Sequence, residues 1–116
     1  MSNNKTYIDW KNWNEDSFAK TSKLEEIYFN NIFKLLKLKK SSKILEIGFG
    51  NGAFLGHAYR QNFHYDGVES NKNLVDLAIN NNFSAYSSLN EIDRKNKYDL
   101  IILFDVIEHI NADVIE

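Results

Sequence analysis

The sequence predicts an α/β fold in which a parallel β-sheet is flanked by helices. Three observations support this prediction. Short apolar, β-rich runs alternate with segments whose apolar residues recur at helical spacing. The first such run ends in glycines at every second position and leads directly into a helical pattern. A later run, residues 98–104, is almost entirely apolar, which is typical of strands buried on both faces of a parallel sheet.

The composition is that of a globular domain. The chain has 116 residues, of which 43% are hydrophobic and 26% charged, so it holds one domain or part of one. Aromatic residues make up 14%, which suggests a core or pocket lined with rings. The net charge of −2 gives no electrostatic support for binding nucleic acid. The absence of cysteine excludes a disulfide framework, a thiol nucleophile and a cysteine zinc site.

The sequence predicts neither a membrane span nor a metal site. Its apolar runs are shorter than the ~18 residues that a spanning helix needs. Residues 1–6 are polar and contain no apolar core of a signal peptide, so the cytoplasm is the expected compartment. His57 and His64 do not have metal-ligand spacing with a third ligand.

A long amphipathic helix is expected to open the domain. Residues 1–21 are predicted to form an N-terminal segment, and residues 22–116 the domain itself. Ser22 and Glu25 have the spacing of a capping box. A stripe of apolar residues follows at helical spacing, and we expect it to pack on the sheet: Leu24, Ile27, Tyr28, Ile32, Leu35 and Leu36, widened by Phe29 and Phe33. Basic amphipathic helices also bind membrane surfaces, but here the lysines cluster at the helix end, which favours packing.

The remaining elements alternate in type, and the crossovers between parallel strands are expected to be right-handed. Strands are predicted at residues 43–47, 65–69, 83–86 and 98–104. Helices are predicted at residues 51–61, after Ser70 as N-cap, and from residue 105 onward. Residues 87–91 are expected to be a loop or a single helical turn.

The last predicted helix has no stop signal, and a buried fourth strand needs a further neighbour. We therefore expect the sequence to be the N-terminal part of a longer protein. The alternative is a four-stranded domain whose last helix covers the open sheet edge.

The run I-L-E-I-G-F-G-N-G-A-F, residues 44–54, is the feature around which the chain is organised. A strand that ends in Gly48, Gly50 and Gly52 and enters a helix brings backbone N–H groups and a positive helix end to one point. Glycine also lets a ligand approach the main chain closely. These residues predict a nucleotide-like ligand at the carboxyl end of the strand. A glycine-rich bend that binds nothing is the alternative.

Two acidic residues narrow the choice of ligand. Gly48, Gly50 and Ala53 also match the dinucleotide fingerprint G-x-G-x-x-A. However, Glu46 stands two residues before the first glycine, where a carboxylate suits an ammonium group and repels a pyrophosphate. Glu69 lies 21 positions beyond Gly48, at the end of the second strand, and can accept hydrogen bonds from ribose hydroxyls. Because S-adenosylmethionine and NAD both carry that ribose, Glu69 supports either ligand.

With Glu69, the run E-I-G-F-G-N-G resembles the first motif of the class I S-adenosylmethionine-dependent methyltransferases. Residues 98–110, Y-D-L-I-I-L-F-D-V-I-E-H-I, resemble the fourth-strand motif of that family. Their closing Glu-His pair is similar to the branch that contains ubiquinone-pathway O-methyltransferases. The resemblance runs from about residue 24 to the end. It implies a Rossmann-like parallel sheet, the N-terminal part of a seven-stranded methyltransferase fold, with S-adenosylmethionine as cofactor.

The resemblance also implies a role for individual residues. The methionine end of the cofactor would lie against Glu46, Gly48, Gly50 and Gly52, and the ribose against Glu69. Ser88 and Leu89 would contact adenine, while Phe104 and Asp105 would lie near the methyl-bearing sulfur. Phe49 and Ser70 complete the expected cofactor-binding set. The stretch Tyr86-Ser87-Ser88 departs from the pattern, because many relatives have an acid there to meet the adenine amine.

The expected function is therefore methyl transfer to a small-molecule acceptor. The cofactor supplies an activated methyl group, so the protein mainly positions the reactants. A hydroxyl acceptor must also lose a proton, and His109 is the candidate base. A packing or capping role is the alternative for His109. The alternatives for the whole chain are an NAD(P)-dependent Rossmann oxidoreductase and a non-catalytic cofactor-binding fragment.

Overall fold

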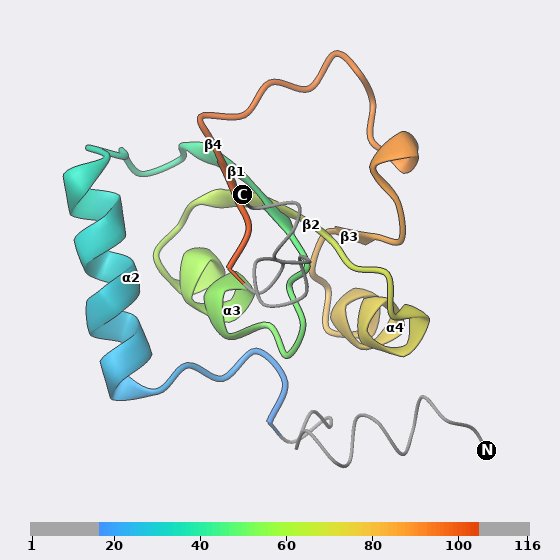
Figure 1. Ribbon diagram of the computed structural model, residues 1–116, viewed down its shortest axis with the longest axis horizontal. Helices are drawn as coiled ribbons and strands as arrows, with labels where there is room; N and C mark the ends of the chain where they lie inside the picture. The colour runs from blue at the N-terminus through green and yellow to red at the C-terminus, as the bar shows by residue number, and fades with distance from the viewer. Residues whose placement is uncertain (1–16, 105–116) are drawn as a thin grey trace, which may run out of the picture.

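The computed structural model describes residues 17–104 (Figure 1). Asp105, His109 and the expected final helix lie outside the described residues. The elements follow one another as α2 (Lys23–Leu35), β1 (Lys43–Ile47), α3 (Ala53–Arg60), β2 (His64–Val68), α4 (Lys72–Asn80), β3 (Ala85–Tyr86), the 3₁₀ helix η1 (Leu89–Glu91) and β4 (Leu100–Ile102). The predicted alternation of strands and helices is confirmed.

The four strands form one parallel sheet in the order β3-β2-β1-β4. The chain moves from β1 to β2 and β3 in one direction and then returns to the other side of β1 for β4. The strand order therefore reverses at β1. Open α/β sheets bind ligands at such a reversal, outside the carboxyl ends of the strands.

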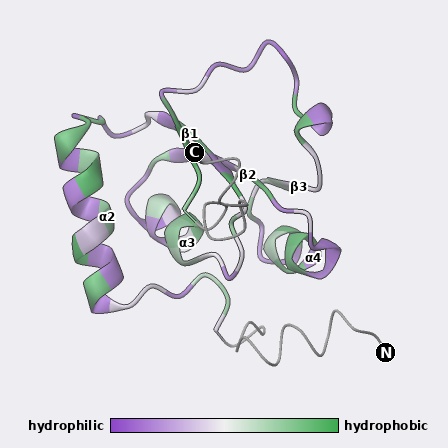
Figure 2. Ribbon diagram, viewed as in Figure 1, coloured by the Kyte–Doolittle hydropathy of each residue, from purple (hydrophilic) through white to green (hydrophobic). Residues whose placement is uncertain are grey.

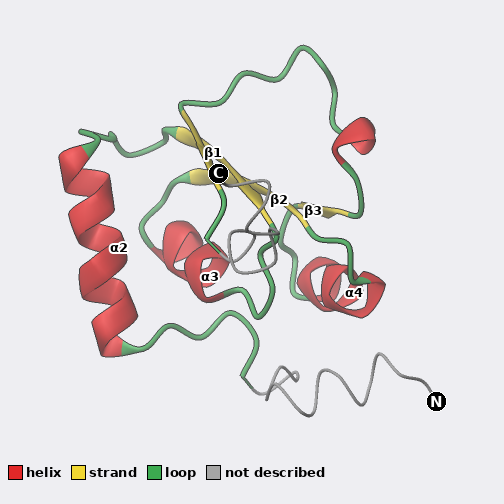
Figure 3. Cartoon of the chain, viewed as in Figure 1, coloured by secondary structure: helices red, strands yellow, loops and turns green. Residues whose placement is uncertain are grey.

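Helices α2, α3 and α4 lie on the same side of the sheet (Figure 3). Two right-handed crossovers that step in the same direction place α3 and α4 on one face, which explains this layer. Between the layer and the sheet lies the hydrophobic core. Its largest fully buried side chains are Phe54, Ile44, Leu55 and Leu74.

The expected capping box at the start of α2 is confirmed. Ser22 Oγ accepts the backbone N–H of Glu25 at 3.1 Å, and Glu25 Oε1 accepts the backbone N–H of Ser22 at 2.9 Å. Both partners are three residues apart on the chain, so this arrangement depends on local sequence alone.

The expected buried stripe of α2 is wrong for most of its members. Phe29 and Phe33 are buried, whereas five residues of the predicted stripe are exposed, with Leu24 at 80%: Leu24, Ile27, Tyr28, Leu35 and Leu36. Apolar residues recur along the whole of α2 (Figure 2), so periodicity did not choose between neighbouring faces. The choice follows from α3, because Phe54 meets the Phe29 ring at 5.1 Å and His57 stacks on Phe33 at 6.0 Å.

The expectation that the fourth strand is buried on both faces is also wrong. β4 is three residues long, and Ile101 is 55% exposed. All three residues pair with β1, but Leu100 and Ile102 pack against the core under the helices, while Ile101 turns to the other face. Among residues 17–104, the helical layer covers one face of the sheet, which explains this exposure.

Residues 17–21 pack on the glycine loop and α3. Phe18 and Ala19 are buried, and the N–H of Ala19 donates to the carbonyl of Asn51 at 2.9 Å. Thr21 Oγ1 donates to the carbonyl of Ala53 at 2.7 Å. The first residues described therefore brace the start of α3.

The N-cap of α4 is Asn71 and not Ser70, so the expected cap is wrong by one position. Asn71 Oδ1 accepts the backbone N–H groups of Asn73 at 3.0 Å and Leu74 at 3.4 Å. Both residue types make good caps, so their neighbouring positions left the sequence ambiguous. The single helical turn considered for residues 87–91 is confirmed as η1, with Ser88 as its N-cap.

Candidate functional site

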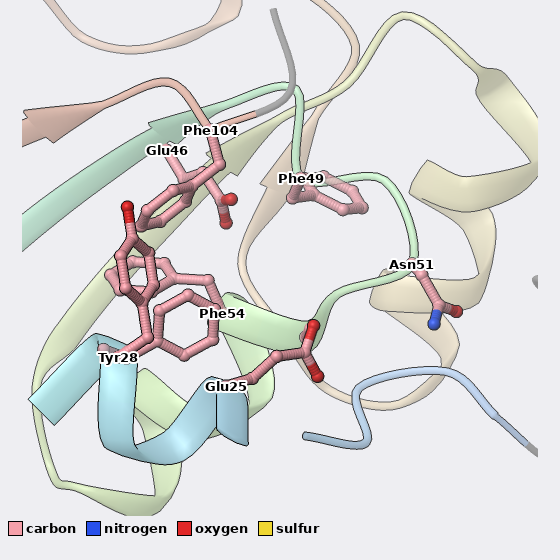
Figure 4. A pocket seen from close by; sticks show the side chains of 9 residues that line it. Glu25, Tyr28, Glu46, Phe49, Asn51, Phe54 and Phe104 are labelled. Carbon is pink, nitrogen blue, oxygen red and sulfur yellow. The ribbon is translucent and has the colours of Figure 1, made fainter. Parts of the chain in front are cut away.

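A pocket of about 420 Å³ opens beside the carboxyl end of β1, where the strand order reverses (Figure 4). It is lined by aromatic rings and two carboxylates: Glu25, Tyr28, Phe29, Glu46, Phe49, Asn51, Ala53, Phe54 and Phe104. These residues come from α2, β1, the glycine loop, α3 and the segment after β4. Three stretches of the chain that are distant in sequence therefore meet here: α2, the continuous run from β1 to α3, and the segment after β4.

Glu46 supplies a carboxylate at the inner wall of this pocket. Its side chain leaves the sheet beside Phe104 and is directed toward the pocket interior (Figure 4). The residue is 2% exposed, and its Oε1 accepts the phenol of Tyr65 at 2.6 Å. Burial, together with the charge of Glu46, raises the pKa of Tyr65 well above its ordinary value. The phenol therefore stays protonated and donates to the carboxylate throughout the physiological pH range.

The glycine loop follows Glu46 directly. Gly48, Gly50 and Gly52 have φ angles of 80°, 56° and 81°, which residues with a side chain rarely adopt. Their N–H groups donate within the protein, to Val68 O at 2.7 Å, Glu69 Oε1 at 2.9 Å and Phe49 O at 2.9 Å respectively. A ligand would therefore use the close approach that the loop permits more than these three donors.

Glu69 ties the loop to the turn after β2. Oε1 of the carboxylate accepts the N–H of Gly50, and Oε2 accepts the N–H of Asn71 at 3.0 Å. A carboxylate has about four acceptor positions, so these two bonds fix its orientation and leave capacity for hydroxyl donors. Glu69 and the glycine loop, expected to share a ligand, are thus in direct contact.

The structure separates the other expected residues. Phe49 and Phe104 line the pocket with Glu46, whereas Ser88, Leu89 and Ser70 lie outside its lining. Ser88 Oγ accepts the N–H of Asn90 at 3.1 Å, and Leu89 is half exposed at the start of η1. Ser70 is exposed beside the turn that Glu69 holds. Asp105 and His109 lie outside the described residues.

Sequence reasoning missed several of the pocket residues. Glu25, Tyr28 and Phe29 have the i, i+3, i+4 spacing that places them on one helix face, but the apolar stripe of α2 predicts packing on the sheet instead. Asn51 lies between two glycines of the motif, and its Oδ1 is buried without a hydrogen-bond partner among the described residues. The position of Asn51 within the motif was the signal that could have identified it.

Comparison with known proteins identifies the family. Residues 21–116 match the model of a family described as a methyltransferase domain. The chain belongs to this methyltransferase family. The match covers the glycine loop, Glu69 and the residues after β4, so the resemblance seen in the sequence is confirmed. The parallel α/β sheet expected from it is confirmed as well.

Curated relatives of this methyltransferase domain include two ubiquinone biosynthesis O-methyltransferases, from strains OSU 85-389 and RML369-C of Rickettsia bellii. Each is 26% identical over 110 residues, which cover 84% of the chain and 46% of the relative. The chain thus spans about half the length of the curated relatives it matches. No solved structure gives a significant match.

Two further features concern the part of this methyltransferase domain that the structure describes. Between residues 17 and 104, no group of three or more His, Cys, Asp or Glu side chains could hold a metal ion. None of the helices in the same stretch has the length and apolar character required to cross a membrane.

Proposed function

We propose that this chain is the cofactor-binding part of an enzyme that transfers a methyl group from S-adenosylmethionine to a small molecule. The family match and the ubiquinone-pathway relatives support methyl transfer. We expect the enzyme to act in the cytoplasm. The proposal for the cofactor depends on one observation, the position of Glu46.

Glu46 places a buried carboxylate at the carboxyl end of β1, inside a pocket with five aromatic rings. S-adenosylmethionine carries an ammonium and a sulfonium group. A carboxylate in surroundings of low dielectric attracts an ammonium strongly, and the faces of aromatic rings attract cations. The pyrophosphate of a nicotinamide cofactor would instead be repelled by Glu46, so this geometry favours S-adenosylmethionine over NAD.

The remaining contacts of the cofactor follow from the positions along the sheet edge. We propose that the methionine end lies against Glu46 and the glycine loop, including Phe49, because the lack of Cβ atoms there permits close approach. The ribose would meet Glu69, with Ser70 beside it. Adenine would extend toward Ser88 and Leu89, which follow β3 on the side away from β4.

The reaction would take place in the pocket on the β4 side of the sheet edge, away from Ser88 and Leu89. Phe104 follows β4 and lies 5.0 Å from Phe54, ring to ring, so it walls the pocket beside Glu46. The cofactor, when bound, supplies an activated methyl group, and the protein aligns the acceptor with it. We propose that Asp105 also lies on this side and that His109 removes the proton of a hydroxyl acceptor.

Titration of the chain with S-adenosylhomocysteine and with NADH tests the cofactor assignment. We expect saturable binding of S-adenosylhomocysteine and none of NADH. Binding of NADH alone would overturn the assignment in favour of an oxidoreductase. Transfer of a labelled methyl group by the full-length gene product tests turnover, and cofactor binding without transfer would indicate a non-catalytic protein.

A further inference from the structure

We propose that Tyr65 is a positioning residue that holds the carboxylate of Glu46 toward the methionine end of the cofactor. This inference rests on the proposed function, because it concerns the same site. The phenol of Tyr65 donates to Glu46 Oε1 at 2.6 Å, and both side chains are almost completely buried. Tyr65 itself does not line the pocket, so it would act on the ligand through Glu46.

The register of the sheet explains how Tyr65 reaches Glu46. Tyr65 lies opposite Ile44 on the neighbouring strand, whereas Glu46 lies opposite Gly67. Side chains two residues apart on a strand share a face, so Tyr65 and Glu46 are diagonal neighbours on the same face. Such diagonal pairs are within reach of an aromatic side chain, provided that the position between them is open.

Gly67 provides that open position. A Cβ atom added to Gly67 would lie 2.8 Å from the Tyr65 hydroxyl and 2.7 Å from Cδ2 of Phe49, both closer than real Cβ contacts. The rings of Tyr65 and Phe49 therefore occupy the space that a side chain at this position would fill. The bond between Tyr65 and Glu46 depends on a glycine in β2.

The surroundings hold the phenol in place. The ring of Tyr65 packs against those of Tyr59 at 5.9 Å and Phe54 at 6.3 Å. Two χ angles describe a tyrosine side chain, so packing of the ring fixes the direction of its hydroxyl. A fixed donor then restricts the orientation of the carboxylate. A side chain that contacts a ligand is held in place by hydrogen bonds from its neighbours. Loss of the Tyr65 phenol should therefore weaken the contact of Glu46 with the ligand.

The affinities of the Tyr65→Phe variant for two analogues of the cofactor test this role. S-adenosylhomocysteine contains the amino-acid tail, and 5′-methylthioadenosine lacks it. We expect Tyr65→Phe to weaken binding of S-adenosylhomocysteine about tenfold, as for loss of a hydrogen bond to a charged group, with 5′-methylthioadenosine changed less than twofold. In a Glu46→Gln background, the same substitution should change the affinity for S-adenosylhomocysteine less than twofold.

Tyr59→Phe is the matched control, because its hydroxyl accepts the N–H of Ser84 and does not reach Glu46. It should leave the ratio of the two affinities unchanged. An equal loss for both ligands in Tyr65→Phe, or no loss for either, would overturn the positioning role alone. Failure of the unmodified chain to bind either ligand would overturn the proposed function and this inference together.

Gly67→Ala gives an independent arm should Tyr65→Phe fold poorly. The added methyl group would displace the Tyr65 hydroxyl and also the neighbouring Phe49 ring, while leaving the phenol in the sequence. We expect a loss of affinity for S-adenosylhomocysteine that exceeds the loss for 5′-methylthioadenosine at least threefold. Equal losses would count against the inference.

Discussion

The carboxylate of Glu69 accepts the backbone N–H of Gly50 at 2.9 Å, which joins the end of β2 to the middle of the glycine loop. The two residues are 19 positions apart in the chain and meet because β1 and β2 are parallel neighbours. The proposed ribose site and the proposed methionine site are thereby linked through one side chain. Loss of the Glu69 carboxylate should therefore affect both sites, because it removes the ribose acceptor and also releases Gly50.

Glu69→Ala should weaken the binding of S-adenosylhomocysteine, 5′-methylthioadenosine and adenosine, and S-adenosylhomocysteine should lose at least as much as the other two because the substitution also releases Gly50. All three ligands carry the ribose, and hydrogen bonds to a charged acceptor contribute about 1.5–3 kcal/mol, which predicts roughly a tenfold to hundredfold loss. Calorimetric titration of the three ligands measures it. Asp76→Ala, an exposed acid on α4, is the control and should bind all three normally. A loss confined to S-adenosylhomocysteine would show that Glu69 does not hold the ribose.

His57 should make the stability of the domain depend on pH. Burial lowers its pKa below 6.5, opposed by the charge of Glu26 and aided by that of Arg60. Its Nε2 donates to Asn30 Oδ1 at 2.7 Å, and its Nδ1 is buried without a partner among the described residues. The unfolded chain therefore binds the proton more readily than the folded chain. The resulting stability is present above pH 6.5 and declines as the pH falls through the folded-state pKa.

Urea unfolding of the unmodified chain and of His57→Gln between pH 8 and pH 5 measures this effect. We expect the difference in free energy of unfolding between the two to shrink as the pH falls. At pH 8 the variant should be less stable by about 1 kcal/mol, the typical net value of one hydrogen bond. His64→Gln, on the exposed side of β2, is the matched histidine control. Parallel curves for the unmodified chain and His57→Gln would contradict the prediction.

Gly56→Ala should destabilise the domain although alanine favours helices. In an open helix position the exchange stabilises by about 1 kcal/mol. Here the added Cβ would lie 2.0 Å from the carbonyl oxygen of Ala19, a backbone atom that Arg60 also holds at 3.0 Å. Displacing residues 17–21 from α3 should cost about 1–3 kcal/mol, as overpacking does. Thermal unfolding measures the loss, with Asn80→Ala in the exposed last turn of α4 as control. A stability equal to or above that of the unmodified chain would show that residues 17–21 can move away from α3 without loss of stability.

The arrangement of the strands and helices could be predicted because the signals are local. Lys43–Ile47 matched its predicted bounds, since an apolar run ended by glycine marks both limits of a strand. The strands β3 and β4 are shorter than predicted, with observed lengths of two and three residues. Strand ends depend on how far the neighbouring strand extends, which a local pattern does not specify.

The candidate site was predictable where its residues stand next to the glycine motif. Glu46, Phe49 and the three glycines are contiguous in sequence, so the strand-to-helix turn itself brings them together. Glu25 and Tyr28 lie about 20 residues earlier, on a helix with apolar residues all along it, and periodicity favoured the wrong face. Which side of α2 meets the pocket depends on Phe54 and Phe104, and these contacts exist only after the chain has folded.

By itself, the sequence determined the α/β class, the capping of α2 and the glycine-rich strand-to-helix turn, because each depends on residues within one turn or strand of one another. The tertiary structure decided that Tyr65 donates to Glu46, that Gly50 is held by Glu69, and that residues 17–21 brace α3. These contacts join elements that are far apart along the chain. They arise from the parallel register and from the space left by glycines, neither of which a local pattern specifies.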